Sequence, residues 1–456
     1  MTAGDHVSSG RLARMAKFAT VGARTAADML AARARQKLGS DDATIAESLK
    51  PTAERLVEVL GEMKGVATKI GQFVSLVDQD NFPEDARKAL HRLLNQAPQR
   101  MEWAQVQTVI RGELGGDPHE LFAQFDQEPL AAASMGQVHG AVTHDGDDVV
   151  VKVQYPGVDK AIESDLRNAG AIARTLSIAG GVLESRHYFD ELSSVLRREL
   201  DYLAEMDQAE VYRDALTPWP DLVVPQFRRD LSTTRMLTME RLRGPTMLQA
   251  AQNEETSGAD RFRLGAQLVA ATWGPFLRQG VIHADPHPGN YIALPDGKLG
   301  VLDFGATKQL SVRFTQAYWR LLDAAFTRTP PDVYSILKTA GFDMQIDKQA
   351  ADAWLMPLTA IVERPFESNH YDWGQCRVSA DVQALTKRHP LLVLRVRAPE
   401  ESLMFYRSAA GAAGDLRLLR SAGDFRFTLI DTARRALGQL APTVAEGLVL
   451  RAAEWA

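Results

Sequence analysis

The sequence is poor in cysteine and in long apolar runs. Its one cysteine, Cys376, excludes an intramolecular disulfide framework and a multi-cysteine metal site, and it fits a reducing, intracellular location. The longest charge-free apolar run around the candidate site, residues 264–277, is shorter than the roughly 18 residues that suggest a membrane-spanning helix. We therefore expect a cytoplasmic protein without a transmembrane helix, bound at most peripherally to a membrane surface.

The sequence also lacks a strong excess of one charge. The formal net charge is −6 over 456 residues, and Lys and Arg are spread along the chain. Because nucleic-acid-binding domains carry concentrated basic patches, we expect no nucleic-acid partner. No pair of histidines has zinc-ligand spacing supported by a third ligand. The length and the 45% apolar content suit two or three domains, or one two-lobed enzyme with extensions.

The sequence is organised around an aspartate that is followed five residues later by an asparagine. Asp285 and Asn290 have the D-x-x-x-x-N spacing of a protein-kinase catalytic loop, and Asp303-Phe304-Gly305 follows shortly after. Magnesium prefers oxygen ligands and usually combines one or two side chains with substrate phosphates. We therefore predict that Asn290 and Asp303 bind Mg²⁺, while Asp285 orients a hydroxyl group or water.

Two histidines flank Asp285. We expect His283 to support the loop. His287 lies between two prolines, where it could contact phosphate or metal or simply pack in a turn. Residues 291–294 and 299–302 flank these motifs and are apolar and strand-like.

A buried lysine is predicted upstream of this loop. Residues 149–153 read as a strand that carries Lys152, at the place where a kinase has the lysine that contacts nucleotide phosphates. A lysine among valines is otherwise costly to bury. Residues 129–142 take the place of the first two kinase strands and the glycine-rich loop, yet most of the loop glycines are missing.

An acidic partner for Lys152 is expected on a helix over residues 188–212. Glu199 is the first candidate and Glu205 the second, and either could instead be a solvated surface acid. Residues 159–183 form a helical insert before this helix. Residues 225–227 and 236–240 resemble the last strands of a kinase N-lobe. A hinge would follow over 240–244, with backbone groups of Glu240 and Leu242 contacting adenine.

The N-terminal region reads as helices. Residues 11–37 are basic and moderately amphipathic, which suits either reversible binding to an anionic membrane surface or a helix docked on the protein. Further on, Lys69 and Gln72 are three residues apart on one helix face among several glycines. They could reach together into a neighbouring pocket, or face solvent beside a glycine-mediated helix contact.

Three motifs in combination resemble the UbiB family of atypical kinase-like proteins, also called aarF-domain kinases. Residues 69–72 match its K-x-G-Q signature, Ala131-Ala132-Ala133-Ser134 its alanine-rich replacement for the glycine-rich loop, and 199–202 its E-x-D element. The resemblance covers residues 62–418.

The resemblance implies an α+β, two-lobed protein-kinase-like fold with an N-terminal helical extension and a mostly helical C-lobe. The implied domains are a basic helix (1–40), the extension with the K-x-G-Q motif (41–120), an N-lobe with a helical insert (121–240) and a C-lobe with C-terminal helices (241–456). Some bacterial members of the family end in transmembrane helices, and residues 446–456 do not resemble them.

The resemblance also argues against protein phosphorylation. In the family the K-x-G-Q helix lies across the mouth of the active site, so Lys69 and Gln72 would gate access. The methyl groups of Ala131–Ala133 would restrict the approach of the loop to phosphates. A helix-like pattern begins at residue 311 and leaves little room for an activation loop. Ala398-Pro399-Glu400 imitates the kinase A-P-E motif but lies too far from Asp303 to close one.

The first functional hypothesis is a Mg²⁺-dependent ATPase or kinase-like enzyme that binds ATP and acts on an isoprenoid or quinone-precursor lipid. The second is a small-molecule phosphotransferase of the aminoglycoside or choline kinase type, whose catalytic loop residues 283–290 also resemble. The third is a nucleotide-sensing scaffold. The intact set of Lys152, Asp285, Asn290 and Asp303 weighs against a catalytically dead protein.

Overall fold

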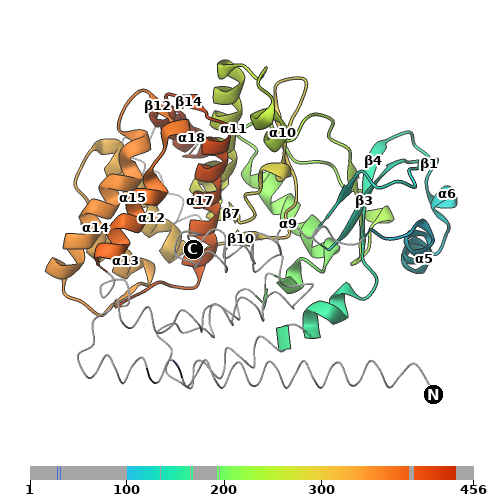
Figure 1. Cartoon of the computed structure of the whole chain (residues 1–456), viewed down its shortest axis with the longest axis horizontal. Helices are drawn as coiled ribbons and strands as arrows, with labels where there is room; N and C mark the ends of the chain where they lie inside the picture. Colours follow the sequence, from blue (N-terminus) through green and yellow to red (C-terminus); the bar gives the residue numbers. More distant parts are fainter. Residues whose placement is uncertain are drawn as a thin grey trace. The chain divides into compact units, whose positions relative to one another are not determined.

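The computed structural model describes two units of the chain. The described residues are 28, 31, 100–133, 135–164, 166–167, 193–194, 196–389 and 395–437. The first unit runs to Tyr202 and includes Arg228–Thr238, and the second contains Leu203–Phe227 and begins again at Met239 (Figure 1). Apart from residues 28 and 31, the basic segment 11–37 lies outside the described residues, as do Lys69, Gln72 and Ser134. The predicted domain boundaries stay a prediction.

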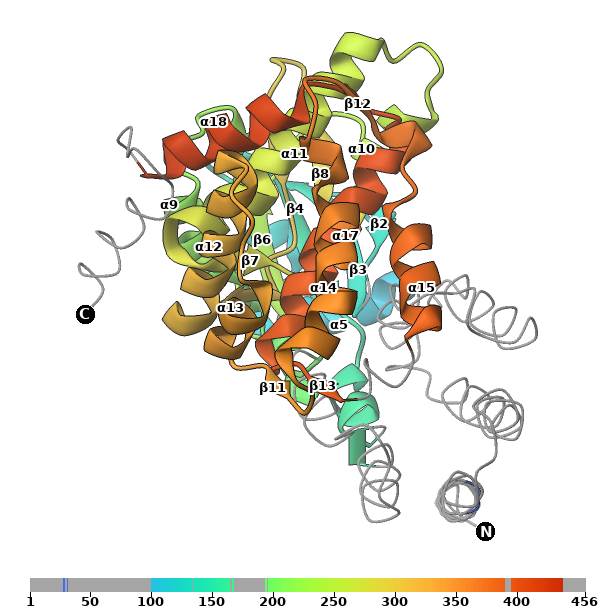
Figure 2. The same ribbon diagram turned by 90° about the vertical axis from the view of Figure 1, so that its left-hand side faces the viewer.

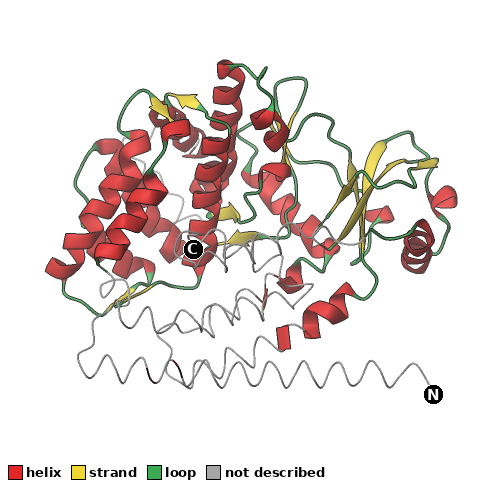
Figure 3. Cartoon of the chain, viewed as in Figure 1, coloured by secondary structure: helices red, strands yellow, loops and turns green. Residues whose placement is uncertain are grey.

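The first unit is built on an antiparallel sheet with the strand order β1-β3-β4-β6, in which β2 pairs with the other end of β3. Figure 3 draws these strands in yellow. Strands β3 and β4 are paired along their whole length, from Gly136 opposite Gln154 to Val142 opposite Asp148. The elements are α5 (Trp103–Leu114), α6 (Pro118–Leu121), β1 (Gln124–Phe125), β2 (Ala131–Ala132), β3 (Gly136–Val142), β4 (Asp148–Gln154), η2 (Arg229–Leu231) and β6 (Met236–Glu240).

Strand β4 has one face that packs in the hydrophobic core and an opposite face that carries Lys152. Val149, Val151 and Val153 are buried in the same hydrophobic core cluster as Val106 of α5. Because successive side chains of a strand point to opposite faces, Lys152 projects from the face away from α5. The valine-rich strand predicted from the sequence therefore forms, and its lysine lies on the face that is not filled by this core.

The second unit is mostly helical and is organised around α11. This helix begins after the N-cap Ser257, whose side chain accepts a hydrogen bond from Asp260 N, and ends at Gly280 with φ of 68°. Glycine adopts this left-handed conformation without strain, so the chain can turn directly into β7. Helix α11 packs against β7, β9, α17 and α18. No helix in the described part of the chain is long and apolar enough to span a bilayer.

Two groups of elements make up the second unit. The first group precedes α12 and contains α9 (Tyr202–Ala215), β5 (Leu222–Val223), α10 (Met247–Gln252), α11 (Gly258–Gln279), β7 (Val281–His283), η3 (Pro288–Asn290), β8 (Tyr291–Ala293), β9 (Leu299–Val301) and β10 (Thr307–Gln309). The second group contains α12 (Val312–Thr327), α13 (Val333–Ala340), β11 (Asp343–Met344), α14 (Lys348–Glu363), η4 (Arg364–Phe366), β12 (Tyr371–Asp372), η5 (Trp373–Gln375), α15 (Val378–Arg388), β13 (Val396–Arg397), α17 (Glu401–Leu418), β14 (Ala422–Gly423) and α18 (Phe425–Leu437). Successive helices from α12 to α15 pack against one another (Figure 2).

Two local predictions need correction. The helix expected over 188–212 is not continuous, because the chain leaves helical geometry at Glu199 and α9 begins only at Tyr202. The Tyr202 N–H donates to Thr234 C=O at 3.1 Å, which withdraws it from the helical hydrogen-bond series. Residues 225–227 do not form a regular strand, since only an isolated bridge links Phe227 to Met239.

The hairpin formed by β8 and β9 carries both predicted metal ligands. Asn290 immediately precedes β8, and Asp303 follows β9 by two residues. The strands pair from Tyr291 opposite Val301 to Ala293 opposite Leu299. The two predicted strand-like segments are therefore confirmed, and the hairpin that they form brings their outer ends together.

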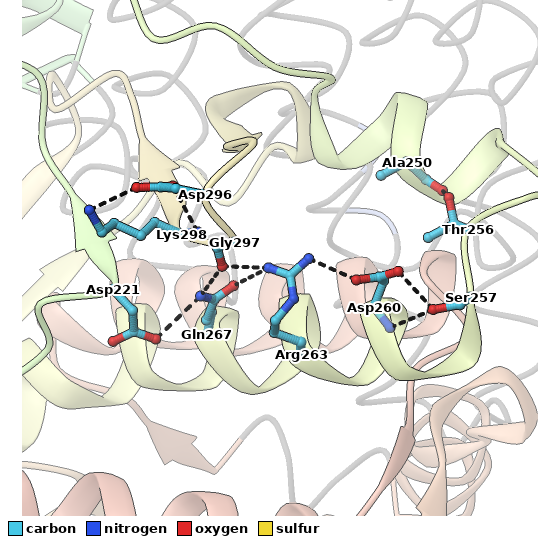
Figure 4. Close-up of polar contacts among 10 residues, drawn as sticks. All are labelled: Asp221, Ala250, Thr256, Ser257, Asp260, Arg263, Gln267, Asp296, Gly297 and Lys298. Carbon is cyan, nitrogen blue, oxygen red and sulfur yellow. Dashed lines mark hydrogen bonds and ion pairs between the residues drawn. The ribbon is translucent and has the colours of Figure 1, made fainter.

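Helix α11 anchors the turn of this hairpin through one carbonyl group. Figure 4 shows that Arg263 Nη1 and Gln267 Nε2 both donate to Gly297 C=O, at 2.5 and 2.9 Å. Gln267 also donates to Asp221 Oδ2 at 3.2 Å, and Arg263 pairs with Asp260 at 3.0 Å. The hairpin position is thus set by hydrogen bonds far from its ligand-bearing ends.

Replacing Gln267 by Met is expected to lower the free energy of unfolding by about 1–3 kcal/mol, because the change keeps most of the buried volume but removes the hydrogen bonds of the amide to Asp221, Gly297 and Arg263. Urea denaturation measures this change. Gln252→Met, at an exposed position on α10, is the matched control and should shift stability by no more than about 0.5 kcal/mol. Equal losses for both variants would contradict the anchoring role.

Candidate functional site

A two-stranded ribbon supports both loops of the site. Strands β7 and β10 are antiparallel, with His283 opposite Thr307. The Ala284 N–H extends the pairing by donating to Ala306 C=O at 3.3 Å. The loop that carries Asp285 and the Asp-Phe-Gly segment therefore leave the same ribbon at adjacent points.

The loop between Asp285 and Asn290 is tied by its own hydrogen bonds. His287 N–H donates to Asp285 C=O at 2.8 Å, and Gly289 N–H donates to His287 Nδ1 at 3.0 Å. His287 is exposed, so this second bond, rather than packing, holds its ring in the turn. Asn290 Nδ2 donates to Asp285 C=O at 3.1 Å. Because the amide nitrogen is held in this way, Asn290 Oδ1 points elsewhere and can serve as an oxygen ligand.

The Asp303 segment lies directly against this loop. Leu302 N–H donates to Asn290 C=O at 2.8 Å, which brings the backbone of the two predicted metal ligands together. Asp303 has φ of 61°, the left-handed region that non-glycine residues rarely adopt. Such conformations persist where the surrounding structure fixes them and are common at ligand sites.

Phe304 anchors the Asp303 segment in the core of the second unit. Its fully buried ring lies 5.5 Å from that of Tyr212 and 5.8 Å from that of His283, measured between centroids. Its N–H donates to Glu205 Oε1 at 3.4 Å. His283 Nε2 lies 3.1 Å from Leu302 C=O, an acceptor, so this nitrogen carries the proton. His283 thus ties β7 to the Asp303 segment, and its predicted support of the catalytic loop stays a prediction.

Helix α17 supplies contacts to the catalytic loop that sequence reasoning missed. Arg407 Nη2 lies 2.6 Å from Asp285 Oδ1, in an ion pair whose side chains are 3% and 10% exposed. The neighbouring Ser408 hydroxyl donates to His283 C=O at 2.9 Å. One turn further along the helix, a Cβ at Gly411 would lie 2.0 Å from Pro286 Cγ, so only glycine allows this approach.

A second acid on α17 lies near Asp285. Burial, and to a smaller extent the negative charge of Asp285, together raise the pKa of Asp415 to about 8. The Asp415 side chain is almost fully buried, and its Oδ2 has no hydrogen-bond partner among the described residues. The carboxyl group is therefore mostly protonated at neutral pH.

The first unit contains the predicted phosphate-binding residues. Lys152 is buried, and its Nζ lies 6.0 Å from the centroid of the Tyr202 ring. Ala131 and Ala132 form β2 opposite Val138 and Gln137. The chain then turns back through Ala133, whose N–H donates to Gly136 C=O at 2.9 Å. Two residues of the predicted alanine-rich loop, Ala131 and Ala132, therefore lie in a strand, and their nucleotide contacts stay a prediction.

One glycine of this turn has a clear structural reason. A Cβ at Gly136 would lie 2.0 Å from Val153 C=O, so β3 can pass β4 here only with glycine. The glycine retained beside the alanine-rich loop therefore serves strand packing.

The two candidate acids occupy different environments. Glu199 is buried in the first unit, in the turn before α9. Glu205 is buried in the second unit, in the first turn of α9, and accepts the hydrogen bond from Phe304 N–H. The pairing of Lys152 with Glu199 or with Glu205 stays a prediction.

The predicted hinge follows β6 and packs on the β8 strand. Glu240 N–H already donates to Gln226 C=O at 2.7 Å, so an adenine ring would have to use other backbone groups, such as those of Leu242. The Leu242 side chain occupies the space over Gly300, where an added Cβ would come within 2.6 Å. Gly244 is required beside Ala293 C=O, which a Cβ would approach to 2.1 Å.

The donor set around Asn290 and Asp303 fits Mg²⁺ only together with a further oxygen source. No group of three or more His, Cys, Asp or Glu side chains in the described ranges could hold a metal ion. One amide oxygen and one carboxylate are, however, the typical protein share of a Mg²⁺ site that is completed by water and substrate phosphates. The residues therefore fit a metal that arrives with a phosphorylated ligand.

Comparison with known proteins decides the family. Residues 92–337, more than half of the chain, match the ABC1 atypical kinase-like domain. The chain belongs to the ABC1 (UbiB/AarF) family of atypical kinases. The family resemblance predicted from the sequence is thereby confirmed.

Several curated relatives share a large part of this chain. The Caenorhabditis elegans mitochondrial atypical kinase coq-8 is 28% identical over 79% of this chain and 48% of its own length. The rat mitochondrial atypical kinase COQ8B is 31% identical over 79% of this chain and 68% of its own length. Mouse AarF domain-containing protein kinase 1 is 31% identical over 72% of this chain and 62% of its own length. The chain thus spans about half to two thirds of the length of these relatives.

A solved structure supports the fold. The complex of Rv3197 with erythromycin, from Mycobacterium tuberculosis, matches with a TM-score of 0.59 and 26% sequence identity over 85% of this chain and 97% of that chain. The α+β, kinase-like fold predicted from the sequence is confirmed by this match and by the family.

Proposed function

We propose that this ABC1-family chain binds MgATP and transfers or hydrolyses the γ-phosphoryl group, in support of isoprenoid-quinone lipid metabolism. The observation that carries the proposal is the arrangement of Asp285, Asn290 and Asp303. Two hydrogen bonds, from Leu302 N–H to Asn290 C=O and from Asn290 Nδ2 to Asp285 C=O, join a proton acceptor and two oxygen ligands in one loop cluster. This is the set of groups that phosphoryl transfer requires.

The proposed reaction assigns each of these residues a role. The bond from the γ-phosphorus to the ADP oxygen breaks, a bond forms to water or an acceptor hydroxyl, and the proton of that oxygen passes to the Asp285 carboxylate. Bound Mg²⁺ would neutralise phosphate charge, and Asn290 and Asp303 would hold it. Lys152 would bind phosphate oxygens, with Glu199 positioning it. Ala131–Ala133 would cover the nucleotide.

Two features support an acceptor other than a protein. The chain runs from Gly305 into β10 and then to Ser311, the N-cap of α12, so the part of the chain where kinases have an activation segment is a short strand and turn. The family relationship points to quinone biosynthesis, so a quinone-precursor lipid is the proposed partner.

Gating by Lys69 and Gln72 and membrane contact through 11–37 complete the proposal, although these residues lie outside those the structure describes, apart from 28 and 31.

The decisive experiment is phosphate release from MgATP by the purified protein, compared with the Asp303→Asn variant. We expect turnover in the wild type and a loss of about 100-fold or more in the variant, since an amide cannot replace the anionic ligand. Asp296→Asn is the matched control, because it makes the same change in the exposed turn of the same hairpin. Turnover of this control should equal that of the wild type.

Additives separate the candidate functions. Anionic liposomes and a phenolic quinone-precursor mimic test the lipid-linked proposal, and erythromycin, the ligand of the mycobacterial relative, tests a macrolide-responsive activity. Turnover that rises with lipid or phenol and disappears in Asp303→Asn would support the proposal. Binding of MgATP without turnover under every condition would instead favour a nucleotide-sensing scaffold.

A further inference from the structure

We propose that Arg407 on α17 is a positioning residue for Asp285, a role that rests on the proposed phosphoryl-transfer function. The guanidinium group holds Asp285 Oδ1 at 2.6 Å. Both side chains are almost completely removed from solvent, so screening by water and salt is weak. The pair joins two residues that are 122 positions apart in the sequence.

Helix α17 presents Arg407 from a backbone that is itself fixed against the loop. Arg407, Gly411 and Asp415 are spaced four residues apart, so they share one face of the helix. Gly411 packs on Pro286 without room for a methyl group, and the adjacent Ser408 bonds to His283 C=O. Two successive turns of α17 therefore contact the catalytic loop and its base, and Arg407 cannot move away from Asp285 without repacking the helix.

The ion pair matters chemically because the Asp285 carboxylate has two oxygens and can rotate about its bond to Cβ. Holding Oδ1 fixes the plane of the Asp285 carboxylate and so the direction in which Oδ2 meets the acceptor O–H. In the proposed reaction that oxygen must lie within hydrogen-bond reach of the attacking group. Arg407 holds this proton-accepting carboxylate in its orientation through a helix that lies outside both sequence motifs. Its loss should therefore impair turnover more than nucleotide affinity.

The experiment compares Arg407→Gln with Arg407→Lys and measures three quantities: kcat for phosphate release, Kd for MgATP and the melting temperature. We expect Arg407→Gln to lower kcat by about 100-fold, the cost typical of a misplaced catalytic group, with little change in Kd. Arg407→Lys retains the charge and should restore part of kcat. Arg417→Gln, at an exposed position of the same helix, is the matched control and should leave all three quantities unchanged.

A double-mutant cycle separates positioning from simple structural support. Asp285→Asn removes the carboxylate that Arg407 is proposed to orient, so adding Arg407→Gln to it should lower kcat no further. The double variant also leaves no unpaired charge in this pair, which protects the test if Arg407→Gln alone unfolds. A further drop in kcat in the double variant would show that Arg407 acts independently of Asp285 and would overturn the proposal.

The outcomes also distinguish this role from the proposed function. An active wild type with unchanged kcat in Arg407→Gln would overturn the role of Arg407 alone. A wild type that binds MgATP but never releases phosphate would overturn the proposed function, and with it the role that depends on it. A fall in melting temperature with an unchanged kcat would identify the pair as structural only.

Discussion

Replacing Asp415 by Asn is expected to stabilise the protein at pH 8 and to have little effect near pH 4. Burial raises the pKa of Asp415 to about 8 from its ordinary value of 3.8. Between these values the unfolded chain has lost the proton and the folded chain retains it. The folded state therefore binds more protons, and stability falls as the pH rises from about 4 to about 8. Asparagine cannot ionise, so the variant escapes this loss.

The full pKa difference corresponds to at most about 6 kcal/mol at pH 8 and above, because each unit is worth about 1.4 kcal/mol. Urea denaturation at pH 4.5, 6 and 8 measures the difference between the variant and the wild type. Asp431→Asn removes a partly exposed ion pair with Arg435 on α18 and serves as the control, with an expected change below about 1 kcal/mol at every pH. A gain from Asp415→Asn that is the same at all three pH values would contradict the buried-acid explanation.

Asp415 also links pH to the catalytic loop. A protonated Asp415 places no second negative charge near Asp285, whereas an ionised one would repel the Asp285 carboxylate. The stability experiment therefore reports the state of a group that lies next to the proposed proton acceptor.

The parts of the site that the sequence predicted are those encoded by short spacings. Asp285, Asn290 and Asp303 lie within nineteen residues of one another, and one hairpin with strand-like flanks is enough to bring them together. Lys152 was also predictable from a local pattern. Burying a lysine among valines is energetically costly, so a lysine in such a strand indicates a functional role. Local patterns of this kind also predicted the start of α12 at Ser311.

The contacts that the sequence did not predict come from distant segments. In the sequence, Ala398-Pro399-Glu400 stands out because it imitates a kinase motif. The residues that contact the catalytic loop begin further along the chain, at Arg407. The family resemblance implies C-terminal helices but not which helix face meets which loop. The break before α9 has the same origin, since the hydrogen bond of Tyr202 N–H to Thr234 C=O joins segments that no local pattern connects.

The same close contact of α17 leads to the prediction with the largest effect on the loop itself. A methyl group at Gly411 would lie 2.0 Å from Pro286 Cγ and 2.6 Å from Pro286 Cβ, and a proline ring cannot rotate out of the way. Gly411→Ala should therefore push the helix and the catalytic loop apart. We expect a loss of about 1–3 kcal/mol in the free energy of unfolding from this overpacking. Turnover should fall by about 100-fold, because the displaced loop carries Asp285.

Gly414→Ala tests the same chemical change on the same helix without the clash. Nothing lies within 4 Å of a Cβ at Gly414, so helix propensity should dominate and stabilise the protein by up to about 1 kcal/mol. The two variants should thus shift stability in opposite directions, and only Gly411→Ala should reduce phosphate release. Wild-type turnover in Gly411→Ala would mean that the catalytic loop tolerates movement of α17. This result would contradict the proposal that Arg407 on α17 positions Asp285.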